Sequence, residues 1–133
     1  MRFEEFLDAV ERRGRLASRE EALRVTRATL ETLAHRLGGG AVCGLAGQLP
    51  SEITQLLTHP SGEPGEAFGA DEFLRRVCER AGADRAQTEQ HAQTVLAVLR
   101  AAVGPAERSA LLARLPTDYG RLFDDRWTRR PAP

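Results

Sequence analysis

The fold is decided by residues 18–37, SREEALRVTRATLETLAHRL, and by residues 84–103, DRAQTEQHAQTVLAVLRAAV, which begin 66 residues later. Each stretch opens with a capping residue, Ser or Asp, and carries Glu or Gln three residues on, which is the sequence signature of a helix start. Apolar residues then recur at helical spacing. We expect two helices of about 20 residues, ending at Gly38 and Gly104 in the left-handed conformation that glycine favours after a helix.

The sequence around these stretches is repeated at nearly the same spacing. Residues 18–57 align without a gap onto residues 84–123, and both segments carry a glycine, then Leu-Pro, then Ser or Thr. Upstream, the Phe-Leu-x-x-Val pattern of residues 6–10 recurs at residues 73–77, at an offset of 67. Chance similarity between helices rich in Ala and Leu does not explain why both segments share the same order of Gly, Leu-Pro and Ser or Thr. The sequence therefore indicates a tandem duplication.

The same pattern predicts the fold class. In each repeat, a first amphipathic helix precedes the long helix, and a shorter segment ending in Leu-Pro follows it. Because proline disfavours helix at the preceding residue, a final helix begins afterwards, with Ser51 or Thr117 as its expected cap. No strand-like alternation occurs. We therefore predict an all-α protein with about eight helices, in two tandem four-helix repeats packed with pseudo-twofold symmetry.

The domain organisation follows from the repeat. We expect a first helical repeat at residues 1–57, a linker rich in proline and glycine at 58–67, a second repeat at 68–124 and a flexible tail at 125–133. A repeat of about 55 residues is marginal on its own, because so short a chain buries little surface. The two repeats should therefore share one core as a single fused globular domain.

Composition excludes several classes of protein. The chain has 133 residues, 19 basic and 19 acidic side chains, and no lysine. No apolar run is long enough to span a membrane, and two cysteines are an ordinary intracellular number. The first residues, MRFEE, lack the basic flank and apolar core of a signal peptide. We expect a cytoplasmic protein without a membrane partner.

The repeated motifs also resemble a known family. The Phe-Leu-x-x-Val helix, the capped long helix with Val-Leu-x-x-Leu, and the Leu-x-x-x-Leu-Pro segment are clearest at residues 73–77, 95–99 and 111–116. This pattern resembles domain-of-unknown-function family 2267, a bacterial family of small all-helical proteins, over roughly residues 3–124. The resemblance implies a helical fold but no activity, cofactor or catalytic residue. The first repeat departs from the pattern, since Thr26 and Thr29 interrupt its apolar stripe.

Candidate metal ligands are few and scattered. Zinc sites use about four ligands with recognisable local spacings, and the sequence has no Cys-x-x-Cys, His-x-x-x-His or Glu-x-x-His pair. Glu31 and His35 share a helix face, but such a pair is commonly a surface charge contact. We predict no metal or cofactor site and a packing or solvated role for the remaining candidates: His35, His59, His91, Cys43 and Cys78.

No catalytic constellation is apparent. A nucleophilic cysteine needs a neighbouring base and an oxyanion donor, whereas free cysteines mostly act as small apolar fillers. The Gly38-Gly39-Gly40 run follows a helix, while a phosphate-binding loop follows a strand and ends in Gly-Lys-Ser/Thr. We predict that the protein is not an enzyme and has no catalytic residue.

The arginines do not form a nucleic-acid footprint. Residues 1–57 contain eight arginines and eight acids, and residues 68–133 contain eleven and nine. Neither half has the basic excess that such binding needs, so a nucleic-acid partner is disfavoured. The tail alone joins an aromatic ring to cations, at Trp127, Arg129 and Arg130. These three residues either pack back on the bundle or contact a partner.

These observations favour a non-enzymatic helical protein that acts through surface contacts, as a protein–protein interaction or self-assembling module. Its partner is another protein or a second copy of the chain, held in the grooves that helical bundles offer. Two alternatives stay open. One is a bundle that binds a small molecule or lipid in an apolar cavity, and the other is a nucleic-acid accessory protein whose binding depends steeply on salt.

Overall fold

The structure is a computed structural model that describes residues 2–37, 47–57 and 66–123. Every regular element in these ranges is helical, and no strand occurs in them, which confirms the all-α prediction. The predicted repeat symmetry and the number of helices remain predictions. In chain order the elements are α1 (Phe3–Gly14), α2 (Arg19–Leu37), α4 (Ser51–Leu56), α5 (Ala70–Ala81), α6 (Arg85–Ala102), α7 (Pro105–Ala113), the 3-10 helix η2 (Thr117–Tyr119) and α8 (Gly120–Phe123).

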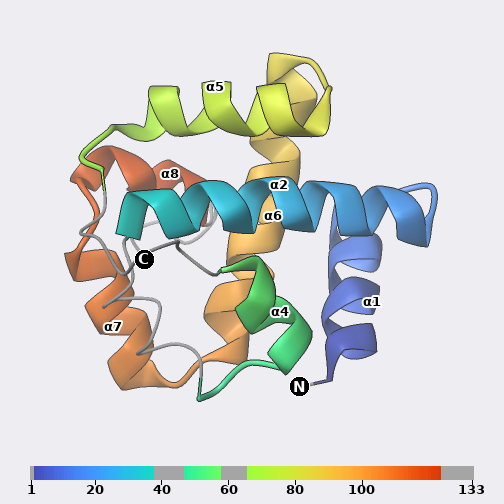
Figure 1. The fold of residues 1–133 in the computed structure, drawn as a ribbon, viewed down its shortest axis with the longest axis horizontal. Coiled ribbons are helices and arrows are strands. Elements are labelled where there is room, and N and C mark those ends of the chain that lie inside the picture. Colours follow the sequence, from blue (N-terminus) through green and yellow to red (C-terminus); the bar gives the residue numbers. More distant parts are fainter. Residues whose placement is uncertain (1, 38–46, 58–65, 124–133) are drawn as a thin grey trace, which may run out of the picture.

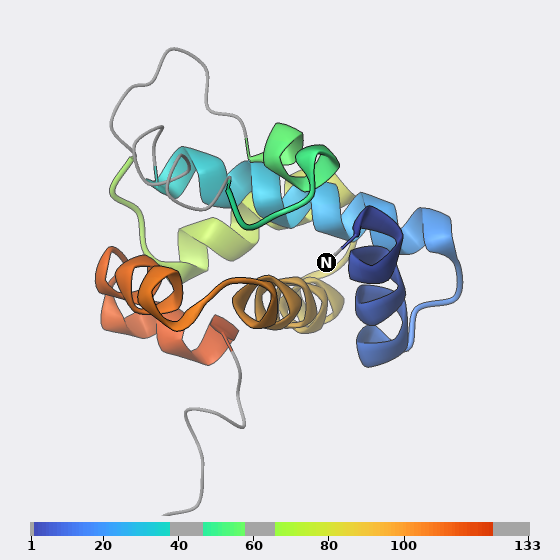
Figure 2. The same cartoon turned by 90° about the horizontal axis from the view of Figure 1, so that it is seen from below.

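The two long helices, α2 and α6, cross at the centre of the molecule (Figure 1). Helix α5 lies alongside α2, and α1 contacts both α2 and α6. Helix α4 packs against α2 and α1, while α8 packs against α6. Figure 2 shows α1 and α7 on opposite sides of α6. Helix α2 is thus in contact with α1, α4, α5 and α6.

All described buried apolar side chains except Ala97 belong to one cluster, to which every α-helix named above contributes, α7 through Leu111. It includes the predicted stripes of α1 and α5, and both long helices contribute their predicted faces. The buried face of α6 is apolar except for Thr88, whereas that of α2 contains three threonines. The largest side chains with almost no exposed surface are Tyr119, Phe6, Phe73, Leu30, Leu33, Ile53, Leu57, Leu74, Leu96, Leu99 and Leu122.

The starts of both long helices are capped as predicted. The Ser18 hydroxyl accepts a hydrogen bond from the Glu21 N–H at 3.1 Å, and the Asp84 carboxylate accepts one from the Gln87 N–H at 2.8 Å. Each bond satisfies a backbone donor that the first turn of a helix leaves free. The sequence signature of these two helix starts is therefore confirmed.

The expected left-handed glycine after α6 is wrong. Gly104 has φ −73° and ψ 169°, an extended conformation, and it serves as the N-cap of α7. The physical reason is Pro105, because a proline disfavours the α region for the residue before it and favours an extended backbone there. Residues in the left-handed conformation instead follow α1, at Arg15 (φ 53°), and α5, at Gly82 (φ 69°). The equivalent prediction for Gly38 lies outside the described residues.

The expected caps of the last helices are also wrong. The N-cap positions are Pro50 and Pro116, and neither makes a side-chain capping bond. Ser51 and Thr117 are already the first helical residues, because the extended backbone of each proline ends the preceding segment. The Ser51 hydroxyl contacts the Glu52 carboxylate at 3.4 Å rather than the backbone.

Three threonines of α2 are completely buried: Thr26, Thr29 and Thr32. The Thr32 hydroxyl donates to the Ala28 carbonyl at 2.8 Å, one turn earlier. The hydroxyl oxygens of Thr26 and Thr29 have no hydrogen-bond partner among the described residues. A buried polar atom without a partner costs the free energy of its lost hydration, about 1–3 kcal/mol.

We therefore expect Thr26→Val and Thr29→Val each to raise the free energy of unfolding by about 1 kcal/mol, because valine has nearly the same shape and no polar atom to desolvate. Thr32→Val is the matched control, and it should lower the free energy because it removes a formed hydrogen bond. Urea unfolding of the three variants checks this order. Equal destabilisation by all three would contradict it.

Candidate functional site

Tyr119 is the centre of a polar cluster where the end of α2 meets the start of α5. Its ring is 1% exposed, and its hydroxyl donates to the Phe68 carbonyl at 2.7 Å. The Arg36 side chain donates to the same carbonyl at 3.0 Å, and its guanidinium lies 5.7 Å from the centre of the Tyr119 ring. Phe73 packs edge-on against that ring, with centroids 5.5 Å apart. The Phe68 carbonyl thus links Arg36, 32 residues earlier in the sequence, with Tyr119, 51 residues later.

Charged side chains make further contacts with this cluster on the α5 side. The Asp118 carboxylate accepts a hydrogen bond from the Ala70 N–H at 3.0 Å, which satisfies a free donor at the start of α5. The Arg76 guanidinium lies 4.0 Å from the centre of the Phe68 ring and bonds Glu72 at 2.8 Å. Hydrogen bonds from Arg75 and then Arg76 lower the pKa of Glu72 to about 2, so this carboxylate is ionised at neutral pH.

These contacts link the end of α2, the start of α5 and the residues around Tyr119. Its carboxylates and guanidinium groups are engaged with one another or with the backbone. Burial raises the pKa of Tyr119 to about 12, more than the nearby Arg36 charge lowers it. The phenol therefore keeps its proton at neutral pH, where it donates to a carbonyl and does not act as a base.

Tyr119 is the one tyrosine of the chain, so the tyrosinate absorbance band reports on it alone. We expect this titration to have its midpoint near pH 12 in the folded protein, above the ordinary value of about 10. Since the folded state holds this proton more tightly, its contribution to stability is complete below pH 10 and is lost as the pH rises towards 12.

Tyr119→Phe removes only the phenolic hydroxyl and keeps the ring. It should lower the free energy of unfolding by about 1 kcal/mol at neutral pH, because the Phe68 carbonyl loses a donor, and it should lack the alkaline titration. A midpoint near 10 in the folded wild-type chain would show that the phenol is not buried as described.

The candidate metal ligands and nucleophiles weighed in the sequence, for which no metal or catalytic role was predicted, are scattered where the structure describes them. Within the described ranges, no three His, Cys, Asp or Glu side chains gather closely enough to hold a metal ion. The His35 carbonyl accepts from the Glu66 N–H at 2.9 Å, the buried Nδ1 of His91 has no partner among the described residues, and Cys78 is a half-buried free thiol. Outside the described residues lie Cys43, His59 and the tail candidates Trp127, Arg129 and Arg130.

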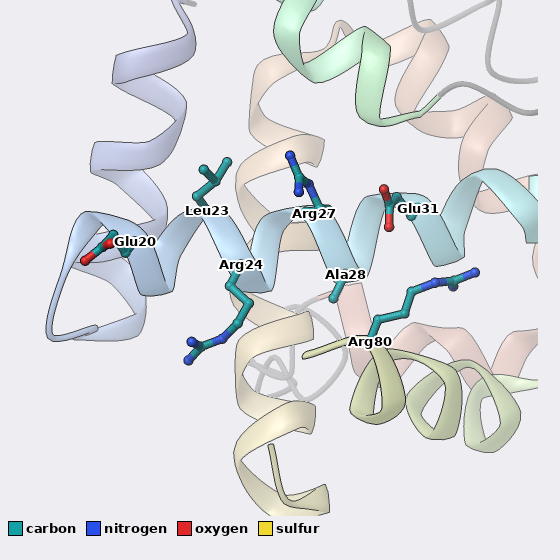
Figure 3. A pocket seen from close by; sticks show the side chains of 7 residues that line it. All are labelled: Glu20, Leu23, Arg24, Arg27, Ala28, Glu31 and Arg80. Atoms are coloured by element: carbon teal, nitrogen blue, oxygen red, sulfur yellow. The ribbon is translucent and has the colours of Figure 1, made fainter. Parts of the chain in front are cut away.

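A groove of about 400 Å³ lies between the outer face of α2 and the end of α5, and we call it the α2–α5 groove. Its walls carry three guanidinium groups, two carboxylates and two apolar side chains. The lining residues are Glu20, Leu23, Arg24, Arg27, Ala28, Glu31 and Arg80 (Figure 3).

The charged groups of this groove do not converge on one point. The Arg24 and Arg27 side chains extend in different directions from the outer face of α2, and Arg80 extends along α2 away from Arg24 (Figure 3). The Arg80 guanidinium also donates to the Thr32 hydroxyl, which holds it against α2. Binding one small anion tightly requires several donors aimed at the same atoms. The geometry instead provides separated charges over a broad face of two helices.

A second groove of about 380 Å³ lies between α1 and α6, and we call it the α1–α6 groove. Its lining residues are Ala9, Arg12, Arg13, Ala97, Val98 and Ala101. Both charged members are arginines from the last turn of α1, and no carboxylate lines it. Each groove thus forms between a long helix and a first helix from the other half of the chain.

Sequence reasoning missed both grooves. One signal was available for the first, because Glu20, Arg24, Arg27 and Glu31 follow one another at helical spacing and mark a polar face of α2. No sequence pattern shows which helix packs beside that face, so Arg80 and the pairing of α1 with α6 became visible only in the structure.

Comparison with known proteins identifies the family. The model of the uncharacterized conserved protein family DUF2267 matches residues 3–122. The chain belongs to the DUF2267 family. This confirms the resemblance found in the sequence, and the match covers both long helices and both grooves of this DUF2267 chain. No curated protein matches it at a significant level. Among the described residues, none of the helices combines the length and apolar character needed to cross a membrane.

Proposed function

We propose that this DUF2267 protein is a non-enzymatic protein–protein interaction module. The observation that carries the proposal is the α2–α5 groove, which spreads three guanidinium groups and two carboxylates over an open face of two helices. Protein interfaces use such mixed, separated charges to select and orient a partner. Within the described part of the chain, Glu20, Arg27 and Glu31 make no hydrogen bond or ion pair, so their charges are available to a partner.

The same groove disfavours the two alternatives. A nucleic acid presents closely spaced negative charges, and Glu20 and Glu31 would repel them. A lipid or small apolar ligand is held in a pocket lined mainly by apolar side chains, whereas five of the seven residues that line this groove are charged. The partner is another protein or a second copy of the chain, and a cytoplasmic location stays a prediction of the sequence.

We also propose that the chain is one fused domain of two tandem repeats related by a pseudo-twofold axis. The lengths of matched helices support this, because α1 and α5 both have 12 residues and start 67 positions apart. Helices α2 and α6 have 19 and 18 residues and start 66 positions apart. The two grooves are consistent with such an axis, since each joins the long helix of one repeat to the first helix of the other.

The proposal is tested by cross-linking in the cells that encode the protein. A photoreactive amino acid replaces Arg27 in the α2–α5 groove or Ala101 in the α1–α6 groove, and Ala110 on the exposed face of α7 is the control site. We expect a discrete protein adduct from at least one groove position and none from Ala110, because a partner lies within reach of a groove. The mass of the adduct distinguishes a second copy from another protein.

Two results would contradict the interaction proposal. One is the absence of any protein adduct from both groove positions in cells that contain the full-length variants at normal levels. The other is the same mixture of weak adducts from Arg27, Ala101 and Ala110, since random collisions do not depend on the groove.

A further inference from the structure

The floor of the α1–α6 groove is apolar and made of small side chains. Ala97 and Val98 are only 5% and 4% exposed, yet they line the groove together with Ala9 and the exposed Ala101. Small side chains leave the backbone of α6 close to the surface, so another helix can approach it closely. Packed helices lie about 8–10 Å apart, depending on the side chains between them.

The rim of this groove is positive. Arg12 and Arg13 are exposed on its α1 side, and the α6 segment from Gln90 to Ala102 contains no acidic residue. Two carboxylates of α1, Asp8 and Glu11, pair with Arg19 at the start of α2 and do not line the groove. A partner with carboxylates beside its apolar face is therefore complementary to the groove in both shape and charge.

We infer that the α1–α6 groove binds an amphipathic helix of a partner protein, with a narrow face of small apolar residues flanked by Asp or Glu. This inference rests on the proposed interaction function and names the chemistry of the partner. The recognition mode is that of a helix laid into a groove, with apolar side chains on the floor and carboxylates at the rim.

The α2–α5 groove serves as an internal control, because it also contains arginines but differs in its other charges. Its arginines are accompanied by Glu20 and Glu31, which repel an acidic helix. A groove of about 380 Å³ accepts only the anchoring side chains of the helix, and the arginines at its rim are exposed to solvent. We therefore expect reversible binding that weakens with salt, since rim charges are screened.

The test is a selection of helical peptides on the full-length protein. The library displays one helical scaffold whose outward positions vary freely among apolar, acidic and basic residues, so that no partner is assumed. We expect enriched peptides to carry Ala or other small apolar residues along one face and Asp or Glu on the flank that lies against α1. Enrichment of basic peptides, or no enrichment over the naked support, would overturn the inference.

Binding of an enriched synthetic peptide to variants then locates the site. Arg12→Glu with Arg13→Glu should weaken binding at least about tenfold, and Arg12→Gln with Arg13→Gln should weaken it less. Arg24→Glu with Arg27→Glu changes net charge equally in the other groove and should have little effect. Ala101→Trp fills the floor and should abolish binding, whereas Ala110→Trp, on α7, should not. Circular dichroism verifies that each variant keeps its helices.

Other outcomes of the binding tests would separate the inference from the proposed function. An equal loss in the two charge-reversed variants shows that binding follows net charge alone and overturns the inference, and so does normal binding by Ala101→Trp. These results leave the interaction function standing if cross-linking from Arg27 yields a discrete adduct. If neither groove cross-links in cells while acidic helices still bind at the α1–α6 groove, the groove chemistry is supported and the cellular interaction function is not.

Discussion

Helix α2 is enclosed by its neighbours, and the rest of the structure depends on this burial. It contacts α1, α4, α5 and α6, so it must be apolar or small on most of its surface. The buried set contains Ala22, Val25, Thr26, Ala28, Thr29, Leu30, Thr32, Leu33, Ala34 and Leu37. The polar face that remains carries Glu20, Arg24, Arg27 and Glu31.

The α2–α5 and α1–α6 grooves both lie where helices of the two halves of the chain pack together. Helix α5 of the second half lies along α2, and α1 of the first half contacts α6. The junction of Tyr119, Arg36 and the Phe68 carbonyl fixes the start of α5 relative to the end of α2. Both grooves therefore lie between packed helices with defined neighbours, which favours partner recognition by a preformed surface.

The sequence predicts the helices better than it predicts their contacts. Apolar periodicity and the Ser18 and Asp84 caps are local signals, and the structure confirms them. Gly104 was predicted wrongly because the effect of Pro105 on the preceding residue outweighs the preference of glycine for a helix end. The hydrogen bond from Tyr119 to Phe68 and the position of Arg80 beside Thr32 join residues about 50 apart. Such contacts depend on how helices pack, which no local pattern specifies.

The most direct test of this account is to express residues 1–60 and residues 68–133 separately and to follow their folding by circular dichroism and thermal unfolding. Since each half lacks the partner helices that enclose α2 or cover α6, we expect neither half to unfold cooperatively alone. Mixing the halves should restore helical content and a cooperative transition, because the shared core forms again. Two halves that each fold cooperatively in isolation would contradict a single core around α2.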